Sequence, residues 1–367
     1  MDRRDFLRYS LALGATFVFG AKKSHAAFPW LRKGLLPPGM VVIDAHAHPD
    51  QFYDSNDPTP DLSSSLEKIT ALGMWGSNFA ASGDNQDGVT PWPHVIDQVE
   101  YVNSLEIERK VKIIRSRDDV LQNLYEKSSI PAAILSLEGA SPIGYEAPTG
   151  AYPDIDAGLD ELFKNGVRMI TVMHRGDNQF GVNMSHEGTD GSGLTALGQQ
   201  LVEDMIKRGI IVDGAHAYYR TLIGMATIAR ANGVPIIDSH TSLSPRPQPN
   251  GSRLRTWKEM EIIVRTGGLI CTWPLQWEST ELGVRRWTIR DWARENFEIK
   301  KRFGAAHIAL GTDGGGQLSD MVDGYTSILD LPKLIAAMHR AGFHEWEIEL
   351  YMGGNFRRVL ETCLPDY

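Results

Sequence analysis

Short apolar runs alternate with longer segments of helical periodicity along the chain after Met40. The short runs are rich in Val, Ile and Ala, whereas the longer segments repeat apolar residues every three to four positions, so each has one face to bury. This alternation is typical of βαβ units and predicts a parallel sheet covered by helices. The predicted strands cover residues 41–46, 75–81, 132–139, 167–174, 210–216, 235–240, 269–273 and 308–313.

Eight strand-helix pairs in 367 residues predict an α/β fold of the (β/α)8 or TIM barrel type, with residues 27–367 forming one domain. A doubly wound open sheet is the structural alternative, because periodicity does not reveal whether a sheet closes. Three loops rich in Gly, Pro and Asp follow predicted strands, at residues 141–154, 175–193 and 242–253. In a barrel these loops would all lie at the catalytic face.

Residues 1–26 have the features of a processing segment outside the fold. Arg3 and Arg4 form an arginine pair, a moderately apolar stretch follows, and small residues precede a predicted cleavage after Ala26. The segment resembles a twin-arginine signal, which implies recognition by the export machinery and a periplasmic or otherwise exported protein. A basic N-terminal arm is the alternative. The apolar stretch is too short to span a bilayer, and we expect no membrane anchor.

The balance of charges bears on the kind of partner. The chain has 37 Lys and Arg against 46 Asp and Glu, which gives a formal net charge of −9. Because this leaves no basic surplus to neutralise phosphates, we expect no nucleic-acid partner.

Titratable residues stand at the C-terminal ends of six predicted strands, and only the second and seventh strands lack one. In a parallel barrel these ends converge on one opening. Each residue alone could be a packed histidine or a helix cap, but six strand ends together predict a functional site. The residues are His46, His48, Glu138, His174, His216, His240 and Asp313.

The residue types at these strand ends favour a metal site. Histidines with a glutamate among them suit divalent cations, with Zn2+ first and Mn2+, Co2+ or Fe2+ as alternatives. Four histidines and Glu138 exceed what one tetrahedral ion needs, so we predict two metal ions with Glu138 as the bridging carboxylate. The histidines are His46, His48, His216 and His240.

Several long motifs resemble the membrane dipeptidase (renal dipeptidase) family of the amidohydrolase superfamily. The resemblance covers most of the chain after Val41, and the motifs occur in the family's order. They are "SLEGA" around Glu138, "VRMITVMHRGDN" around His174, "GLTALGQQLVEDMIKRGIIVDGAH" before His216, "PIIDSHTS" at His240, "GTDGGG" at Asp313 and "GGNFRRVLE" near the C-terminus.

The resemblance implies a role for each matching residue. Glu138 would bridge the metals, His46 would ligate the first, and His216 and His240 would ligate the second. His174 would contact the substrate carbonyl and Asp313 would handle protons. An arginine after the sixth strand would bind the substrate carboxylate. The candidates are Arg246, Arg253 and Arg255, and an ungapped count back from "RTGGLICTW" selects Arg253.

Two positions depart from the family pattern. The first strand carries His-x-His, with His48 where dipeptidases usually have an aspartate, and "GTDGGG" lacks the second aspartate usual after the eighth strand. A neutral imidazole in place of a carboxylate removes one negative charge from the first metal site, which makes its ion more Lewis-acidic.

The sequence thus predicts an exported binuclear hydrolase that cleaves the amide bond of L-L or L-D dipeptides by metal-activated hydroxide. One alternative is an amidohydrolase acting on another small substrate, such as a lactone, an N-acyl amino acid or a phosphoester. Another is an exported binding protein with an inactive barrel. The sequence leaves the oligomeric state open, a homodimer included.

Overall fold

The structure is a computed structural model of the whole chain. It describes residues 30, 33–49, 63–85, 88–125, 129–146, 152–185, 192–244, 253–279, 284–316, 318 and 320–366. The predicted signal segment 1–26 and Arg246 lie outside these residues.

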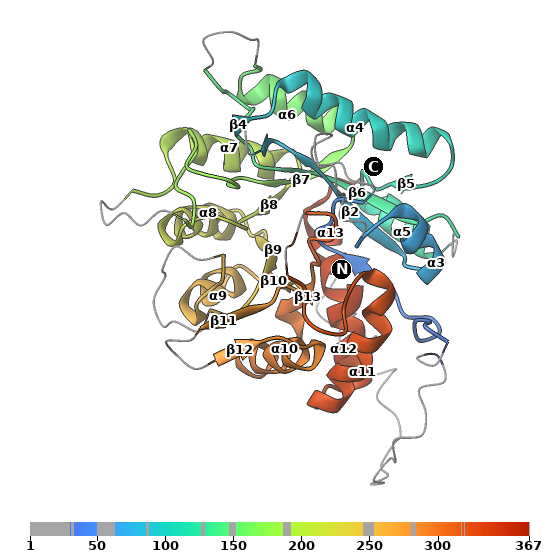
Figure 1. Cartoon of the computed structure of the whole chain (residues 1–367). Coiled ribbons are helices and arrows are strands. Elements are labelled where there is room, and N and C mark those ends of the chain that lie inside the picture. Colours follow the sequence, from blue (N-terminus) through green and yellow to red (C-terminus); the bar gives the residue numbers. More distant parts are fainter. Residues whose placement is uncertain are drawn as a thin grey trace, which may run out of the picture.

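Eight parallel strands form the centre of the fold, and each corresponds to a predicted strand. The strands pair in chain order, so every neighbour in the sheet is also the next barrel strand along the chain (Figure 1). They are β1 (Ile43–Asp44), β2 (Gly76–Ser82), β6 (Ala132–Glu138), β7 (Val167–Thr171), β8 (Ile211–Asp213), β9 (Ile237–Thr241), β10 (Leu269–Thr272) and β13 (Ile308–Leu310).

Contacts between the first and last strands close the sheet. The Ala45 N–H donates to the Leu310 carbonyl at 3.0 Å, and Ala47 forms a parallel bridge with Gly314. Closure with helices outside confirms the predicted barrel over the open-sheet alternative.

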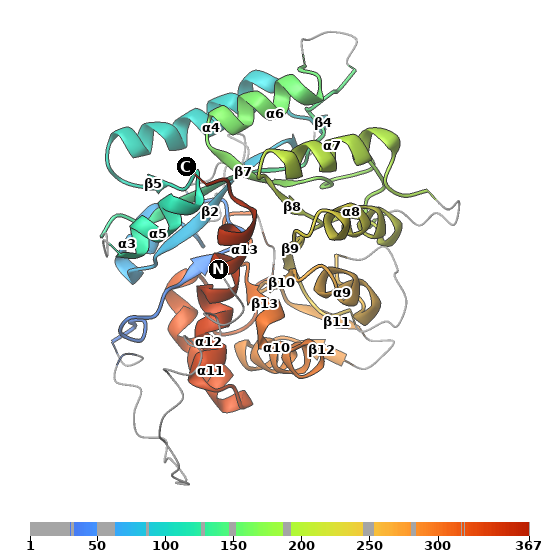
Figure 2. The ribbon, with the colours of Figure 1, turned by 180° about the vertical axis from the view of Figure 1, so that it is seen from behind.

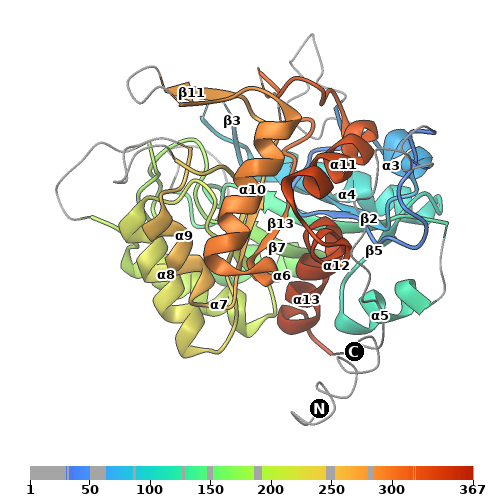
Figure 3. The same ribbon diagram turned by 90° about the horizontal axis from the view of Figure 1, so that it is seen from below.

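Helices surround the sheet, as the views from behind and from below also show (Figures 2 and 3). Their ends follow local sequence signals: Thr256 and Glu259 form a capping box at the start of α9, and Gly73 ends α3 in the left-handed conformation. The helices are α3 (Leu66–Leu72), α4 (Trp92–Ile107), α5 (Arg117–Tyr125), α6 (Ile155–Lys164), α7 (Ala196–Lys207), α8 (Tyr219–Ala231), α9 (Trp257–Val264), α10 (Ile289–Phe303), α11 (Leu331–Ala341), α12 (Glu345–Glu349) and α13 (Asn355–Cys363).

The barrel also has shorter elements that the sequence did not predict. A short strand, β5, pairs with the start of β6, and two antiparallel hairpins follow β2 and β10. They are β5 (Lys112–Ile113), β3 (Asp84–Asn85) with β4 (Gly88–Val89), and β11 (Trp277–Ser279) with β12 (Val284–Arg286), besides the short helices η1 (Ala305–His307), η2 (Ile328–Asp330) and η3 (Leu350–Gly354).

Alternation along β6 separates the barrel interior from the layer beneath the helices. Ala132 and Ile134 pack in one cluster with Met169 and Ile211 of the next strands, whereas Leu135 packs in the cluster that contains the helix faces. The first cluster also contains side chains of α13 and α5, namely Phe356, Val359, Leu360 and Val120. These two helices therefore close the N-terminal end of the barrel with apolar residues.

The interior becomes polar towards the C-terminal ends of the strands. Ser136 donates to Asn78 Oδ1 at 2.9 Å, and Thr171 donates to Asp213 Oδ2 at 2.6 Å. Asp213 also accepts from the Ser239 N–H at 3.0 Å. The side of β6 that faces the barrel interior carries Ile134, then Ser136 and then Glu138. Along the strand, this side therefore passes from an apolar layer through a polar layer to the functional site.

Arg255 is fully buried between β8, β9 and α9. Its Nε lies 2.5 Å from Asp238 Oδ2 and its Nη1 lies 3.2 Å from Glu259 Oε1. The guanidinium also donates to the carbonyls of Gly214 and Ala217, at 2.6 Å each. These contacts use the donors of Arg255 inside the fold, so this residue does not bind the substrate carboxylate.

Among the described residues, no helix combines the length and the apolar character that a bilayer crossing requires.

We expect Arg255→Met to lower the free energy of unfolding by about 3–5 kcal/mol, because it leaves two buried carboxylates without their cation. Urea unfolding followed by circular dichroism measures the change. Arg253→Met, on an exposed side chain two residues away, is the matched control and should stay within about 0.5 kcal/mol of the parent. Equal stability of the two variants would contradict the structural role of Arg255.

Candidate functional site

The carboxylate of Glu138 lies at the end of β6 with a side chain that is only 3% exposed, and imidazoles from the other strand ends surround it. Five histidine Nε2 atoms approach its two oxygens. The distances are 3.3 Å from His46, 3.3 Å from His48, 3.6 Å from His174, 3.3 Å from His216 and 3.5 Å from His240. The barrel thus brings together all the histidines predicted at strand ends.

Asp313, in the segment that follows the C-terminal end of β13, completes the cluster. Its Oδ1 lies 3.7 Å from His46 Nε2 and 3.6 Å from His48 Nε2. The Nε2 atoms of His216 and His240, which both approach Glu138 Oε1, face each other at 2.7 Å. Two nitrogens at this distance need a proton or a cation between them, since two lone pairs repel each other.

Two site residues have left-handed backbones, although neither is a glycine. The φ angle is 60° at His216 and 52° at Asp313. A non-glycine residue in this region costs about 1–2 kcal/mol. Backbone hydrogen bonds hold both turns. The Gly214 N–H donates to the Ile237 carbonyl at 2.7 Å, and the Asp313 N–H donates to the His46 carbonyl at 2.8 Å.

Hydrogen bonds at the other ring nitrogen orient two of the histidines. His48 Nδ1 lies 2.9 Å from the Ala80 carbonyl, and His240 Nδ1 lies 3.0 Å from Ser239 Oγ. Because a carbonyl only accepts, His48 carries its proton on Nδ1 and presents the lone pair of Nε2 to the cluster. Metal-binding histidines are commonly oriented in this way.

Burial and mutual charge shift the pKa values in the cluster in opposite directions. Burial lowers the pKa of His48, His216 and His240, to about 4 for His216. Burial also acts to lower the pKa of His46, but the charges of Glu138, Asp313 and Asp213 outweigh it and raise that pKa to about 9. For Glu138, burial raises the pKa, yet the charges of His174 and His46 hold it well below its usual value.

The arrangement fits a divalent metal centre. Three overlapping groups each bring their ligand atoms within 4.8 Å of one another. His46 Nε2 is buried and lies 3.3 Å from Glu138 Oε1, without a well-aligned hydrogen bond among the described residues. Imidazoles around an ionised carboxylate are the donor set that zinc and similar cations prefer, and a bound cation would displace the proton that the neighbouring carboxylates keep on His46. The groups are His46, His48 and Asp313; His46, Glu138 and His240; and Glu138, His174 and His216. His174 and Asp313 are thus close enough to be ligands, besides the roles that the resemblance implies.

The segment after the second strand carries a buried carboxylate that the sequence analysis missed. Asp84, two residues after β2, is buried and its Oδ1 lies 2.5 Å from His174 Nδ1. β2 itself ends at Ser82 without a titratable side chain, as predicted, but the chain continues into the β3–β4 hairpin and turns Asp84 inward, which the strand pattern did not indicate. The aspartate in "SGDN" is the only sequence signal for it.

The three candidate arginines have different environments. Arg255 is buried in the ion pairs described above, which excludes it as the carboxylate ligand, and Arg246 lies outside the described residues. Arg253 is exposed, and its charge contributes to lowering the pKa of His216, after burial and His174. Of the two described candidates, only Arg253 has an exposed side chain.

A second buried arginine, Arg286 of β12, supports the wall beside His240. It donates to Ser242 Oγ and to the carbonyls of Trp273 and Leu275. The Trp273 ring lies 5.2 Å from the His240 ring, centroid to centroid. Arg286 therefore holds the chain beyond β9 and β10 in place around the site.

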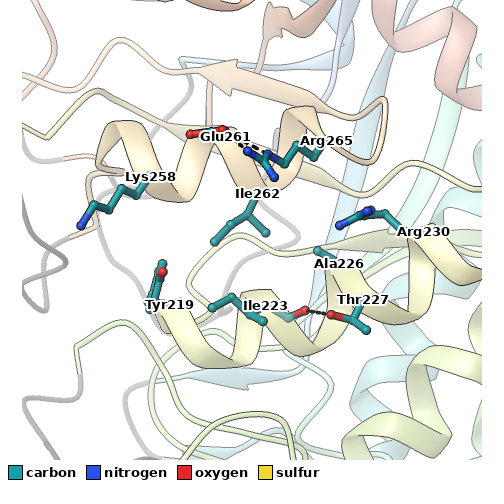
Figure 4. A pocket seen from close by; sticks show the side chains of 9 residues that line it. All are labelled: Tyr219, Ile223, Ala226, Thr227, Arg230, Lys258, Glu261, Ile262 and Arg265. Atoms are coloured by element: carbon teal, nitrogen blue, oxygen red, sulfur yellow. Dashed lines mark hydrogen bonds and ion pairs between the residues drawn. The ribbon is translucent and has the colours of Figure 1, made fainter.

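A groove on the outside of the barrel is separate from this cluster. It runs between α8 and α9, with Ile223 and Thr227 on one side and Ile262 on the other (Figure 4). No residue of the histidine cluster lines this groove.

Solved structures with similar folds include metallopeptidases. A metallo peptidase from Rhodobacter sphaeroides, liganded with a phosphinate mimic of the dipeptide L-Ala-D-Ala, has a TM-score of 0.71 at 18% identity, over 88% of this chain and 99% of that one. The probable dipeptidase PvdM from Pseudomonas aeruginosa has a TM-score of 0.70 at 18% identity, over 89% and 96%. These likenesses support the same fold.

Sequence comparison leads to the same group. Dipeptidase tcpJ of Claviceps purpurea is 24% identical over 72% of this chain and 58% of its own length, and the uncharacterized dipeptidase C965.12 of Schizosaccharomyces pombe is 27% identical over 75% and 64%. The chain thus matches about three fifths of the length of these curated relatives.

The sequence model of one family covers most of the chain. The model described as membrane dipeptidase (peptidase family M19) matches residues 43–364, which include every strand of the barrel and the whole histidine cluster. The resemblance found in the sequence is therefore confirmed: the chain belongs to the membrane dipeptidase family, peptidase family M19.

Proposed function

We propose that this protein is a metal-dependent hydrolase that cleaves the peptide bond of dipeptides, L-L or L-D. The observation that carries the proposal is the approach of five buried histidine Nε2 atoms to within 3.6 Å of the Glu138 carboxylate. The family match and the dipeptidase names of its relatives support the substrate class. The dipeptide mimic bound by the Rhodobacter sphaeroides relative supports a substrate with a D-residue.

We further propose that the cluster holds two divalent ions, zinc being the best match to its donors. Glu138 would bridge them, with His46 and His48 on one side and His216 and His240 on the other. When bound, such ions polarise a carbonyl group and acidify water near neutral pH. The low pKa values of His48, His216 and His240 support this assignment, because a metal ligand has to be deprotonated.

His174 and Asp313 would act on the substrate directly. His174 would donate from Nε2 to the oxygen of the tetrahedral intermediate, which requires a proton on each ring nitrogen because Nδ1 faces the Asp84 carboxylate. Asp313 would accept a proton from the attacking water and pass it to the leaving amine. Its position beside His46 and His48 suits this transfer.

Arg253 would bind the free carboxylate of the substrate in a two-pronged contact and so restrict the enzyme to short peptides. Its exposure and its electrostatic effect on His216 support the assignment.

One observation favours a second candidate, an amidohydrolase acting on a lactone, an N-acyl amino acid or a phosphoester. His48 supplies a neutral ligand where dipeptidases usually supply an aspartate, and its Nε2 lies 3.3 Å from Glu138 Oε2. The cluster is therefore less negative than in the family pattern. That difference changes which substrates the site stabilises best.

The location of the protein is a separate proposal. We propose twin-arginine export to the periplasm from the pattern of residues 1–26.

Two further points concern the protein as a whole. That it forms a homodimer remains a prediction. That it is an inactive binding protein is an alternative, which the activity measurements below address.

We expect His240→Ala to lose bound metal and to lower the rate of dipeptide hydrolysis about a hundred-fold or more, since the lost Lewis acidity is worth several kcal/mol. Elemental mass spectrometry and an amine-release assay measure the two effects. His307→Ala is the matched control, because His307 lies before β13 at the other end of the barrel and contacts the Gly268 carbonyl at 2.9 Å. Full metal content and activity in His240→Ala would refute the assignment.

We expect Arg253→Met to lower kcat/KM for free dipeptides about ten- to a hundred-fold, because a hydrogen bond between charged groups contributes about 1.5–3 kcal/mol. The same substitution should leave hydrolysis of a C-terminally amidated dipeptide unchanged. Arg265→Met, which breaks an exposed ion pair with Glu261 on α9, is the control. An equal loss on both substrates would argue against carboxylate binding.

A substrate panel distinguishes the two candidate functions. Metal-loaded protein should release amine from L-L or L-D dipeptides faster than it hydrolyses lactones, N-acyl amino acids or phosphoesters. Two bound metals without dipeptide hydrolysis would support the second candidate. Inertness on the whole panel after zinc or manganese is added would support the binding protein.

A further inference from the structure

Asp84 begins the β3–β4 hairpin that follows β2, and its side chain is directed away from solvent into the barrel mouth. The main chain on both sides is held in place. The Ser82 hydroxyl donates to the Asp84 carbonyl at 2.6 Å, and the Thr90 N–H donates to the Gly83 carbonyl at 3.0 Å. The hairpin thus fixes where this carboxylate stands.

The two oxygens of Asp84 have different neighbours. Oδ2 accepts from the Ser141 hydroxyl at 3.0 Å, and Oδ1 lies 2.5 Å from His174 Nδ1. The other nitrogen of the same ring, Nε2, lies 3.6 Å from Glu138 Oε2. The imidazole of His174 therefore connects Asp84 to the metal cluster.

The space for this carboxylate depends on a glycine. Gly139, directly after Glu138, has a φ of 89°, and a Cβ atom at this position would lie 2.7 Å from Asp84 Oδ2. Both the backbone conformation and the close approach require glycine there. The residue next to the bridging carboxylate is thus shaped to admit a second carboxylate behind His174.

The His174 backbone is also held, by the side-chain amide of Asn183, which donates to its carbonyl. With the main chain anchored, the remaining freedom of His174 is the rotation of its ring. An ionised carboxylate only accepts, so the approach of Asp84 Oδ1 to 2.5 Å favours the proton on Nδ1 and the ring orientation that directs Nε2 to the cluster.

We infer that Asp84 is a positioning residue for the hydrolytic reaction: its contact with His174 Nδ1 fixes the ring so that Nε2 meets the substrate carbonyl. The inference deepens the proposed function and rests on it for the role of His174. Asp84 lies outside the predicted ligand set. According to this inference, it affects the rate only through the position of His174.

A double-mutant cycle on the metal-loaded full chain tests this inference. Asp84→Asn should lower kcat for a dipeptide about ten- to a hundred-fold, as loss of a residue that orients an active histidine does, with KM and metal content close to the parent. In a His174→Ala background the same Asp84→Asn change should alter kcat less than about two-fold. Asp119→Asn is the matched control, because this aspartate accepts from the Arg115 and Ser116 N–H groups before α5, at the end of the barrel opposite the site.

Three outcomes, two kinetic and one of metal content, would overturn the inference. Parent-like kcat in Asp84→Asn means that the contact does not support turnover. A full further loss in the His174→Ala background means that Asp84 acts by another route. Loss of metal from Asp84→Asn means that it supports the metal centre and not the position of the ring.

A spectroscopic measurement separates failure of this inference from failure of the proposed function. Proton NMR should detect a strongly downfield imidazole N–H in the parent and in Asp119→Asn, and this signal should vanish in Asp84→Asn and in His174→Ala. The result does not depend on any substrate. Its persistence in Asp84→Asn would refute the positioning contact, whereas its expected loss in a protein inert towards dipeptides would refute only the proposed substrate.

Discussion

The burial of one carboxylate, that of Glu138, is the constraint on which the rest of the site depends. An ionised carboxylate inside a barrel is strongly destabilising unless positive charge or hydrogen-bond donors surround it. Here five histidines from four strand ends surround it, with Nε2 atoms 3.3–3.6 Å from the two oxygens, and, against the effect of burial, the charges of His174 and His46 hold its pKa well below the usual value. Such an arrangement needs strands that point to one place from all sides. A closed parallel barrel supplies this geometry, because all its strands end at the same opening.

The apolar interior of the barrel and the candidate site lie towards opposite ends of the strands. At the N-terminal end, Ile134 and Met169 pack on the apolar side chains of α13. Towards the C-terminal end the interior turns polar, and the left-handed backbones of His216 and Asp313 lie there. Strained conformations persist where the surrounding structure holds them. The apolar half and the buried Arg255 network provide that rigid surrounding.

The distribution of charge around Glu138 distinguishes this site from the family pattern. His48 brings a neutral imidazole, held by the Ala80 carbonyl, to a position where an aspartate is usual. Negative charge stands instead at Asp313 and, behind His174, at Asp84. In the proposed reaction, these carboxylates would act on the cluster through the histidines that they contact.

The sequence by itself determined the strand positions, the alternation of strands with helices and the set of strand-end residues, because alternation and helical period are local properties of the chain. The motifs around Glu138, His174 and His240 were long enough to indicate the family. Only the tertiary structure decided which side chains meet. It placed Arg255 in a buried ion pair, because the partners of a guanidinium group depend on residues far away in the chain. It also turned Asp84 towards His174, because the direction of a hairpin depends on distant residues as well. Closure itself was also decided there, by contacts such as that between Ala45 and Leu310, which join the two ends of a sheet that no local pattern can connect.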